Sequence, residues 1–426
     1  MTNSLELEIT GIAHGGFGVG RTDDGLAAFV RGAIPGERVR AEVWEQKTRF
    51  VKATAVAVLE ASEYRVTHPW PLGAAGETGA ADFGHIALDF QRELKRRVIL
   101  EQAQRIGGGR LAEQLEGFDM RPKALERPLV SMSASDSGYG WHTRTRVDVV
   151  KLRRGVGMYR EHSHELLPLT HMPLAVSELD SLGLWGGSSA SSRHWDELIK
   201  PGTRLRVVAP ASGANVVAAA NHAWTSARHE LSGRISERAS DGERIYDYEL
   251  SPTGFWQIHY GAPSALLTRV MRGTQAQSGM RVLELFSGAG LFSLPLARAI
   301  GEHGQLLSIE GSDVAVQDAR RNLRELPWAQ ARQGWIDERS VRDGLDELDP
   351  DVVVVDPPRA GLGIKGAREL AASNARRVVL VSCDPAAMAR DAGALVEGGW
   401  QLASAEALDL FPHTHHIETI LTLVRR

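Results

Sequence analysis

Residues 378–391 read VVLVSCDPAAMARD and contain Cys383, the single cysteine of the 426-residue sequence. The apolar run 378–381 predicts a buried β-strand, and Asp384-Pro385 ends it, because proline has no N–H to donate to a sheet ladder. Residues 386–396 predict a helix. The thiol should therefore face a helix N-terminus, where thiol pKa values fall and reactivity rises. This favours a reactive cysteine over the alternative of a buried, inert one.

Further apolar runs lie on both sides of this stretch, at 282–285, 306–309, 352–355 and 419–424. Helical patterns, beginning with residues 262–272, separate most of them. Strands that alternate with helices predict a parallel, doubly wound sheet. We therefore expect a Rossmann-like C-terminal domain over residues 255–426.

The first strand of this domain leads into a glycine turn. Residues 281–297 read RVLELFSGAGLFSLPLA, with Gly288, Gly290 and Ser293 at the spacing G-x-G-x-x-S. Glycines let the backbone approach a ligand, and the following helix N-terminus favours polar or anionic groups. Glu310 ends the next strand, where a carboxylate can bind ribose hydroxyls. This pattern alone suits either NAD or S-adenosylmethionine.

The N-terminal region has a different pattern. Residues 1–62 contain five short strand-like runs with glycine turns, which predict a small OB-like β-barrel. Residues 63–254 alternate polar and apolar positions in short runs. They predict a central α+β domain built on an antiparallel sheet, with helices near 86–106 and 174–182. The complete chain is therefore predicted to be a multidomain α/β protein.

Composition limits the function classes. A single cysteine excludes a disulfide framework and any site with several thiolates. No apolar run reaches membrane-spanning length, and the N-terminus lacks a signal-peptide pattern, so we expect a cytoplasmic protein with no membrane partner. The net charge of −4 gives no sign of a nucleic-acid binder by itself.

The chain resembles the S-adenosylmethionine-dependent RNA 5-methyluridine methyltransferases. The motifs that carry the resemblance occur in the family's order: SPTGFWQIH, ELFSGAGLFSLPLA, SIEGS, VDPPRAGL, VSCDPAAMARD and FPHTHHIETI. The N-terminal segments ITGIAHGGFGVGR and AFVRGAIPGERVRAEV resemble the TRAM domain, an RNA-binding barrel. Together these resemblances cover nearly the whole chain. They imply an RNA partner and S-adenosylmethionine, rather than NAD, as cofactor.

The resemblance also implies roles for individual residues. It places Cys383 and Glu418 in catalysis. The cofactor-binding set that it implies is Gln257, Phe286, Gly288, Glu310, Asp337 and Asp356. Of these, Asp337 represents a polar contact expected somewhere within residues 333–337.

Uracil chemistry explains why the family needs a thiol and a base. C5 of uridine is too weak a nucleophile to take a methyl group unaided. Addition of a thiolate to C6 makes an enolate with charge at C5, and a base must later remove the C5 proton so that the thiol can leave. The uracil must also be turned out of its stack of nucleobases to reach such a pocket. Cys383 is the expected nucleophile and Glu418 the expected base.

The sequence departs from the family pattern at two places. Many relatives carry four cysteines for an iron–sulfur cluster, but the corresponding loop here reads HPWPLGAAGETGAADFGH, followed later by His171-Met172-Pro173. One cysteine cannot hold such a cluster, so no metal is expected. His413, His415 and His416 precede Glu418, and we expect them to position the loop and contact substrate rather than bind a metal. His259 stands where relatives usually have asparagine.

Two other functions remain open at this point. An RNA cytidine C5 methyltransferase usually uses two cysteines, and this chain has one. A non-catalytic RNA-binding protein of the same fold would have no need for Cys383, Asp356 and Glu418. We therefore expect methylation of a uridine C5 in structured RNA, either ribosomal RNA or tRNA, and the TRAM-like segment favours ribosomal RNA.

Overall fold

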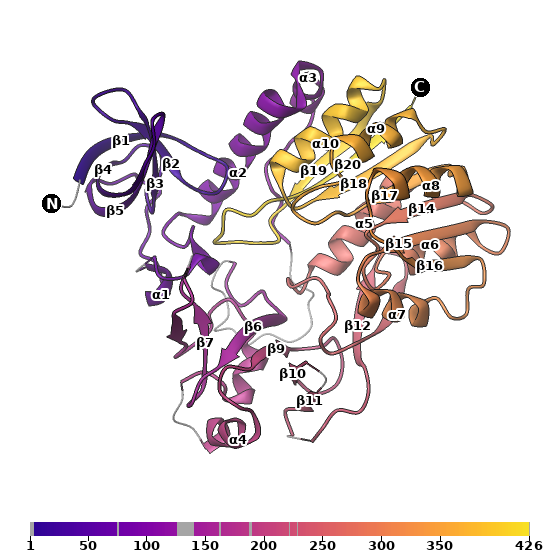
Figure 1. The fold of residues 1–426 in the computed structure, drawn as a ribbon, viewed down its shortest axis with the longest axis horizontal. Helices are drawn as coiled ribbons and strands as arrows, with labels where there is room; N and C mark the ends of the chain where they lie inside the picture. Colours follow the sequence, from indigo (N-terminus) through magenta and orange to yellow (C-terminus); the bar gives the residue numbers. More distant parts are fainter. Residues whose placement is uncertain are drawn as a thin grey trace.

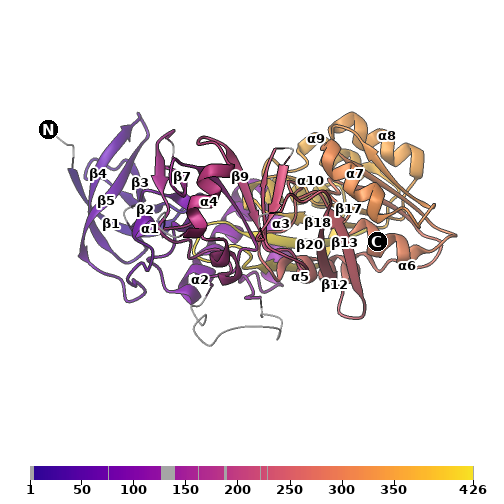
Figure 2. The same ribbon diagram turned by 90° about the horizontal axis from the view of Figure 1, so that it is seen from below.

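The computed structural model describes residues 4–74, 76–125, 140–161, 163–186, 190–220, 222–227 and 229–425. Three bodies follow one another across the molecule: an N-terminal barrel, a central sheet and a C-terminal sheet covered by helices (Figures 1 and 2). Within these residues, no helix is both long and apolar enough to cross a lipid bilayer.

The N-terminal body is a closed five-stranded barrel, as predicted, in the order β1-β2-β3-β5-β4. Alternate side chains such as Leu7, Ile9, Val30 and Val39 point inward and fill it, because successive strand residues face opposite sides. Strands β3 and β5 pair in parallel, and the other neighbours are antiparallel. The strands are β1 Ser4–Ile12, β2 Gly18–Arg21, β3 Ala27–Arg31, β4 Arg38–Gln46 and β5 Phe50–Glu60.

The central body contains the predicted antiparallel sheet, with six strands in the order β11-β10-β9-β6-β7-β8. Trp195 and the 3₁₀ helix η3 (Ser177–Leu182) pack into its core. The predicted helix near 174–182 is therefore a shorter 3₁₀ turn. The remaining elements are α1 Pro71–Ala74, η1 Gly79–Ala81, β6 Arg146–Lys151, β7 Val156–Tyr159, β8 Leu166–Pro168, α4 Ala190–Leu198, β9 Arg204–Val208, β10 Val216–Ala219 and β11 His222–Thr225.

The C-terminal body is a seven-stranded sheet in the order β16-β15-β14-β17-β18-β20-β19. The expectation of a parallel sheet was wrong for one strand, because β20, next to the edge strand β19, is antiparallel to both of its neighbours. The strands are β14 Arg281–Leu285, β15 Gln305–Glu310, β16 Ala329–Gln333, β17 Val352–Val355, β18 Arg377–Ser382, β19 Gln401–Leu408 and β20 Glu418–Val424.

Two hydrophobic cores lie on the two faces of this sheet. On one face, Leu283, Val353 and Leu380 pack against α8, α9 and α10; on the other, Val282, Val354 and Val379 pack against α5, α6 and α7. The helices are α5 Ala262–Thr274, α6 Ser293–Ile300, α7 Asp313–Asn322, α8 Glu338–Leu348, α9 Ile364–Ala372 and α10 Pro385–Glu397.

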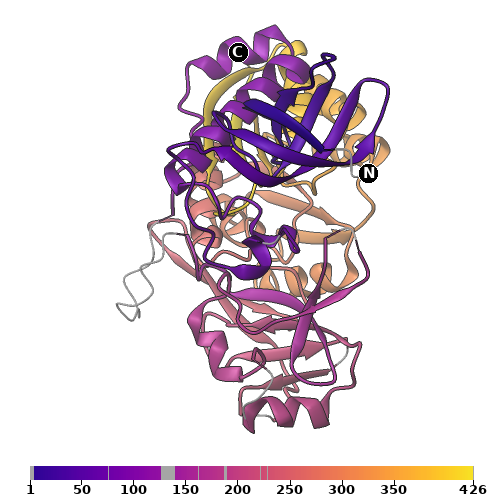
Figure 3. The ribbon, with the colours of Figure 1, turned by 90° about the vertical axis from the view of Figure 1, so that its left-hand side faces the viewer.

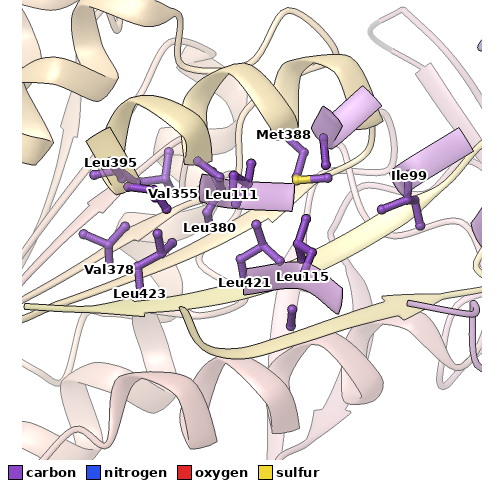
Figure 4. Packing of buried hydrophobic residues seen from close by; sticks show 14 of the residues in the cluster. Ile99, Leu111, Leu115, Val355, Val378, Leu380, Met388, Leu395, Leu421 and Leu423 are labelled. Carbon is purple, nitrogen blue, oxygen red and sulfur yellow. The ribbon is translucent and has the colours of Figure 1, made fainter. Parts of the chain in front are cut away.

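Two segments from the predicted central domain pack on the C-terminal body instead. Helix α2 (Leu88–Gln102), the π-helical turn η2 (Ala103–Gly107) and α3 (Gly109–Glu116) lie against α10. Figure 4 shows Ile99, Leu111 and Leu115 from these helices beside Met388 of α10 and Leu421 of β20. The hairpin β12 (Ile235–Ser240) and β13 (Ile245–Leu250) packs on the opposite face, against α5 and α7.

The hydrophobic cores therefore do not divide at residue 254, the expected domain boundary. Residues 88–116 and 235–250 share the cores of the C-terminal sheet. The physical reason is the amphipathic face of α3, where Leu111 and Leu115 stand one helical turn apart. Residues 126–139, within the predicted central domain, lie outside the described residues.

Candidate active site

The predicted site residues gather at one edge of the C-terminal sheet. Phe286, Asp356 and Cys383 each follow directly after parallel strands β14, β17 and β18, and Glu310 ends β15. Carboxyl ends of parallel strands meet at the same edge. Glu418 joins them because β20 runs in the opposite direction and begins there.

The glycine turn after β14 forms a cradle around the Glu310 carboxylate. Gly288 N donates to one oxygen of Glu310 at 3.0 Å, and Ser312 N donates to the other at 2.7 Å. Phe286 adopts a left-handed backbone, with φ of 62°, and its N–H binds the Ile309 carbonyl at 2.9 Å. Gly288 is also left-handed, with φ of 55°, and no atom lies within 4 Å of the position a Cβ would take. The turn therefore leaves open space next to an oriented carboxylate.

Gln257 lies between the C-terminal body and the central sheet. Next to it, Trp256 is buried against Tyr248, and Ile258 O accepts a bond from Thr145 N at 2.8 Å. His259, which replaces the usual asparagine, is buried and its Nδ1 accepts from Gly261 N at 3.1 Å. The histidine thus stabilises the turn into α5.

Asp337 has a structural role in this fold. It is the N-cap of α8, and its Oδ1 accepts a bond from Ser340 N at 2.9 Å while Ser340 Oγ accepts one from Asp337 N at 2.8 Å. Such a reciprocal capping box satisfies helix N–H groups that have no partner in the helix. The side chain is also exposed. We therefore leave Asp337 out of the proposed cofactor-binding set.

Buried acids surround the cradle and raise one another's pKa. Burial, with the negative charge of Glu310, raises the pKa of Asp356 to about 7. Glu284 within β14 is fully buried, and burial together with Asp356 and Glu310 raises its pKa to about 8. Burial and Asp356 raise the pKa of Glu418 well above its ordinary value. Such a cluster is suited to a positively charged ligand.

The thiol of Cys383 differs from the sequence expectation. It lies at the N-terminus of α10 as predicted, with Asp384 as the N-cap. Its pKa is raised to about 12 instead of being lowered, because burial is reinforced by the nearby charges of Glu418 and Asp356. Arg359 opposes this effect. The helix dipole is thus outweighed by desolvation and by acids that the sequence pattern does not place nearby.

The loop 409–417, which leads into Glu418, is held by α2. Lys95 Nζ binds Asp409 Oδ1 at 2.7 Å and the Phe411 carbonyl at 3.0 Å, both in the protein interior. Gln91 Oε1 accepts a bond from His413 N at 2.9 Å. Because these α2 side chains are buried, the helix fixes the approach of the chain to Glu418.

The three histidines of this loop have separate partners. His413 stacks on Trp141, with ring centroids 4.0 Å apart. His415 Nδ1 lies 2.6 Å from Asp82 Oδ2. His416 Nε2 lies 3.0 Å from the Arg359 guanidinium, and burial lowers its pKa to about 2, so it is neutral and accepts that bond. Across the described ranges, no three His, Cys, Asp or Glu side chains form a metal-binding group.

Trp70 and His68 lie in the segment that the family resemblance compares with a cluster loop. Trp70 is fully buried in the central core. The two ring nitrogens of His68 contact the Ala81 carbonyl, at 2.9 Å, and Trp70 N, at 3.1 Å. Thr78 Oγ1 lies 3.6 Å from the sulfur of Met158. Packing and hydrogen bonds, together with the ion pair between Glu77 and Arg160, hold this region together.

Sequence reasoning missed three residues at the site: Glu284, Arg359 and Asp384. Glu284 could have been found, because burying a carboxylate inside the apolar run RVLEL is costly and therefore indicates a structural or functional role. Its Oε2 accepts a bond from Ser293 Oγ at 2.5 Å. Arg359 and Asp384 stood within quoted motifs, but their partners come from distant segments.

Comparison with known proteins identifies the chain. Residues 3–56 match the TRAM domain, residues 337–426 match tRNA (Uracil-5-)-methyltransferase, and residues 244–346 match Protein-L-isoaspartate(D-aspartate) O-methyltransferase. An uncharacterized RNA methyltransferase of Streptomyces avermitilis is 36% identical over 99% of this chain and 98% of its own length. A 23S rRNA (uracil(1939)-C(5))-methyltransferase of Halomonas elongata is 31% identical over 98% of this chain and 89% of its own. The chain belongs to the RNA uracil-C5 methyltransferase family.

A solved structure supports the fold assignment. The Pyrococcus abyssi tRNA (uracil-54, C5)-methyltransferase, in complex with S-adenosyl-L-homocysteine, aligns with a TM-score of 0.64 and 20% identity over 99% of both chains. The present enzyme is thus an S-adenosylmethionine-dependent RNA uracil-C5 methyltransferase, with RNA as its substrate.

The cradle fits this cofactor chemically. The Glu310 oxygens, each bound by one backbone N–H, keep lone pairs for ribose hydroxyls. Ser287 Oγ and Glu284 Oε1 are buried without a hydrogen-bond partner among the residues that the structure describes. Buried polar atoms nearly always have a hydrogen-bond partner, so these two atoms are available to a bound ligand. The surrounding acids complement a sulfonium cation.

Proposed function

We propose that the enzyme methylates C5 of a uridine in 23S ribosomal RNA, at the position equivalent to uracil 1939, through a covalent bond between Cys383 and C6. The target is supported by the Halomonas elongata relative, whose name states this nucleotide and whose similarity spans 98% of the present chain. The barrel by itself does not discriminate, because the archaeal tRNA enzyme aligns over its whole length too.

The observation that carries the chemistry is the position of Cys383 beside Glu418. Ser382 of β18 pairs with Thr419 of β20, so the next residue on one strand and the preceding residue on the other lie opposite each other. The Thr419 hydroxyl donates to the Ser382 carbonyl at 3.2 Å and holds the two strand ends together. This register supports the proposal, because it brings the proposed nucleophile and the proposed base to the same edge of the sheet.

In the proposed reaction, the Cys383 thiolate adds to C6 of the uracil and places negative charge on C5 and O4. C5 would then form a bond to the methyl group of bound S-adenosylmethionine, and the sulfonium would keep the electron pair of the broken S–CH3 bond and leave as a neutral thioether. Glu418 then takes the remaining proton from C5, the C5–C6 double bond re-forms, and the electron pair of the C6–S bond returns to the Cys383 thiolate. The proton ends on Glu418, so the atoms and charges balance.

Gln257, Phe286, Gly288, Glu310 and Asp356 are the proposed cofactor-binding residues. Glu310 would bind the ribose hydroxyls, and Gly288 would keep the backbone close to the ligand. The acids around the cradle favour a cation, and a cation bound there lowers their pKa values and that of Cys383. Ligand binding would therefore bring both the thiol and Glu418 nearer to their reactive, ionised forms.

Nucleoside analysis tests this function and its target. Ribosomal RNA and tRNA from a strain lacking the gene should be digested separately and examined by mass spectrometry. We expect 5-methyluridine to be lost from 23S ribosomal RNA and retained in tRNA. Loss from tRNA alone would refute the proposed target, and loss of 5-methylcytidine would favour the cytidine enzyme.

A further inference from the structure

The loop between β1 and β2 of the barrel, residues 13–17, contacts the turn between β18 and α10, which holds Cys383 and Asp384. His14 Nε2 lies 2.9 Å from Asp384 Oδ2, although the two residues are 370 positions apart. The His14 side chain is 40% exposed and that of Asp384 is 19% exposed, so the contact lies at the rim of the site. His14 belongs to the barrel and Asp384 to the C-terminal body. Figure 3 shows the barrel lying in front of the C-terminal body.

Asp384 connects His14 to the nucleophile. It follows Cys383 in the chain, and its Oδ1 accepts bonds from Ala386 N at 3.0 Å and Ala387 N at 2.8 Å at the start of α10. The other oxygen, Oδ2, binds His14. The carboxylate is therefore fixed from the helix on one side and from the barrel on the other, one residue beyond the thiol.

The pKa shifts of His14 and Asp384 have the directions expected of an ion pair. The bond with Asp384 raises the pKa of the His14 imidazole, and the charge of Arg359 opposes it. Burial alone would raise the pKa of Asp384, but the bonds from His14 and from the helix backbone lower it below its ordinary value. Protonated histidine and ionised aspartate thus stabilise each other.

A second contact places the same loop against the histidine segment. Gly16 has a φ of +81°, and a Cβ on it would lie 2.8 Å from His415 Cβ and 2.9 Å from Asp82 Oδ2. Asp82 in turn binds both the His415 ring and its backbone N–H. Because there is no room for a methyl group, the loop is in close contact with the segment that leads to Glu418.

We propose that the barrel is part of the catalytic site, with His14 as a positioning residue that fixes the backbone of Cys383 through Asp384. The glycine at position 16 lets the same loop support His415. This inference rests on the proposed role of Cys383. Its consequence is that the barrel controls the rate of the covalent step, in addition to any contact it makes with RNA.

The test is the rate at which the full-length enzyme forms a covalent adduct with RNA that contains 5-fluorouridine, in the presence of S-adenosylmethionine. Fluorine at C5 cannot be removed as a cation, so the Cys383 adduct accumulates and can be timed on a denaturing gel. RNA and cofactor affinities are measured on the same variants. The experiment therefore separates the covalent step from binding.

We expect His14→Ala to slow adduct formation about 10-fold to 100-fold, as for the loss of a hydrogen bond to a charged group. RNA and cofactor dissociation constants should change less than about twofold. His14→Gln should recover most of the rate, because its side-chain amide can donate from nearly the same position as Nε2. An unchanged rate in His14→Ala, or a loss that appears only in RNA affinity, would overturn the inference.

Two neighbouring glycines provide a matched pair. Gly15 and Gly16 both have positive φ, so alanine strains the backbone at either position. A methyl group at Gly15 would meet Phe17 of the same loop at 3.7 Å, whereas one at Gly16 would collide with His415. Gly16→Ala should slow the adduct and Gly15→Ala should not. Equal rates in the two variants would contradict the inference, whereas no adduct with the unaltered enzyme would overturn the proposed function and this inference with it.

Discussion

Cys383 directly follows β18, and Glu418 is the first residue of β20, so the two residues flank the last antiparallel pair, Ser382 and Thr419. Burial, reinforced by neighbouring negative charge, raises the pKa of both side chains above their ordinary values. The proposed chemistry needs both in their ionised forms at different steps. The state of these two groups therefore depends on what occupies the cradle beside them.

Replacement of Cys383 by alanine should abolish RNA methylation and leave S-adenosylmethionine affinity nearly unchanged, since the thiol acts on the uracil. Isothermal titration calorimetry with the cofactor, beside a methylation assay on ribosomal RNA, measures both quantities. A large loss of cofactor affinity would place Cys383 in the cofactor cradle instead.

Glu310→Ala should weaken S-adenosylmethionine binding by about 1–3 kcal/mol, through the loss of hydrogen bonds to the ribose. Asp337→Ala is the matched control, because Asp337 caps α8. It should lower the melting temperature slightly without changing cofactor affinity. The assignment fails if the two variants show the reverse pattern.

Cofactor affinity should rise with pH and binding should release protons. Near neutral pH and before a cation binds, Glu284, with a pKa of about 8, is mostly protonated, and Asp356, with a pKa of about 7, is about half protonated. A cation favours their ionised forms. Calorimetry near pH 7, in buffers of different ionisation enthalpy, should detect this release. Asp356→Asn should reduce it, and equal heats in all buffers would contradict the electrostatic account.

The same groups predict how stability depends on pH without cofactor. Because their pKa values in the folded protein exceed their ordinary values, their contribution is complete below about pH 4. It is lost as the pH rises through about 7 to 8. The free energy of unfolding should fall as the pH rises from about 4 to about 8. S-adenosylmethionine should stabilise the protein most at the upper end of this pH range. Denaturant titrations at several pH values measure both effects.

Protein purified without oxygen should contain no stoichiometric iron or sulfide. Cys383 is the only cysteine, and a cluster of the relatives' kind needs four thiolates. Trp70 and His68 stabilise the corresponding loop by packing and hydrogen bonds. Metal analysis and a visible spectrum of the anaerobic protein check this, and one cluster per chain would contradict it.

Much of the C-terminal fold could be predicted because its central strands are short, fully apolar runs. Residues 352–355 were predicted as a strand and form β17 with these same bounds. The edge strands β16 and β19 were missed. β16, with the sequence AQARQ, has mixed burial and no apolar run, as expected of a strand with one unpaired side.

Sequence patterns do not predict the direction of a strand or the packing of distant segments. An apolar run such as 419–424 looks the same in either direction, so the antiparallel course of β20 could not be deduced. That course carries Glu418 to Cys383. In the same way, nothing local in His14 indicates Asp384 as its partner, and the raised pKa of Cys383 follows from acids that only the folded chain brings together.

The most direct test of the central claim is the behaviour of Glu418→Gln. The amide keeps the size of the carboxylate but is a poor base, so Cys383 should still add to C6 and the methyl group should still be transferred. Removal of the C5 proton should stall, and the thiol cannot then leave.

The measurement is a denaturing gel of Glu418→Gln incubated with ribosomal RNA and S-adenosylmethionine labelled in its methyl group. We expect a slowly migrating protein–RNA adduct that carries the label and is absent when Cys383 is also replaced by alanine. Release of methylated RNA from Glu418→Gln at the normal rate would show that another residue is the base and would contradict the account.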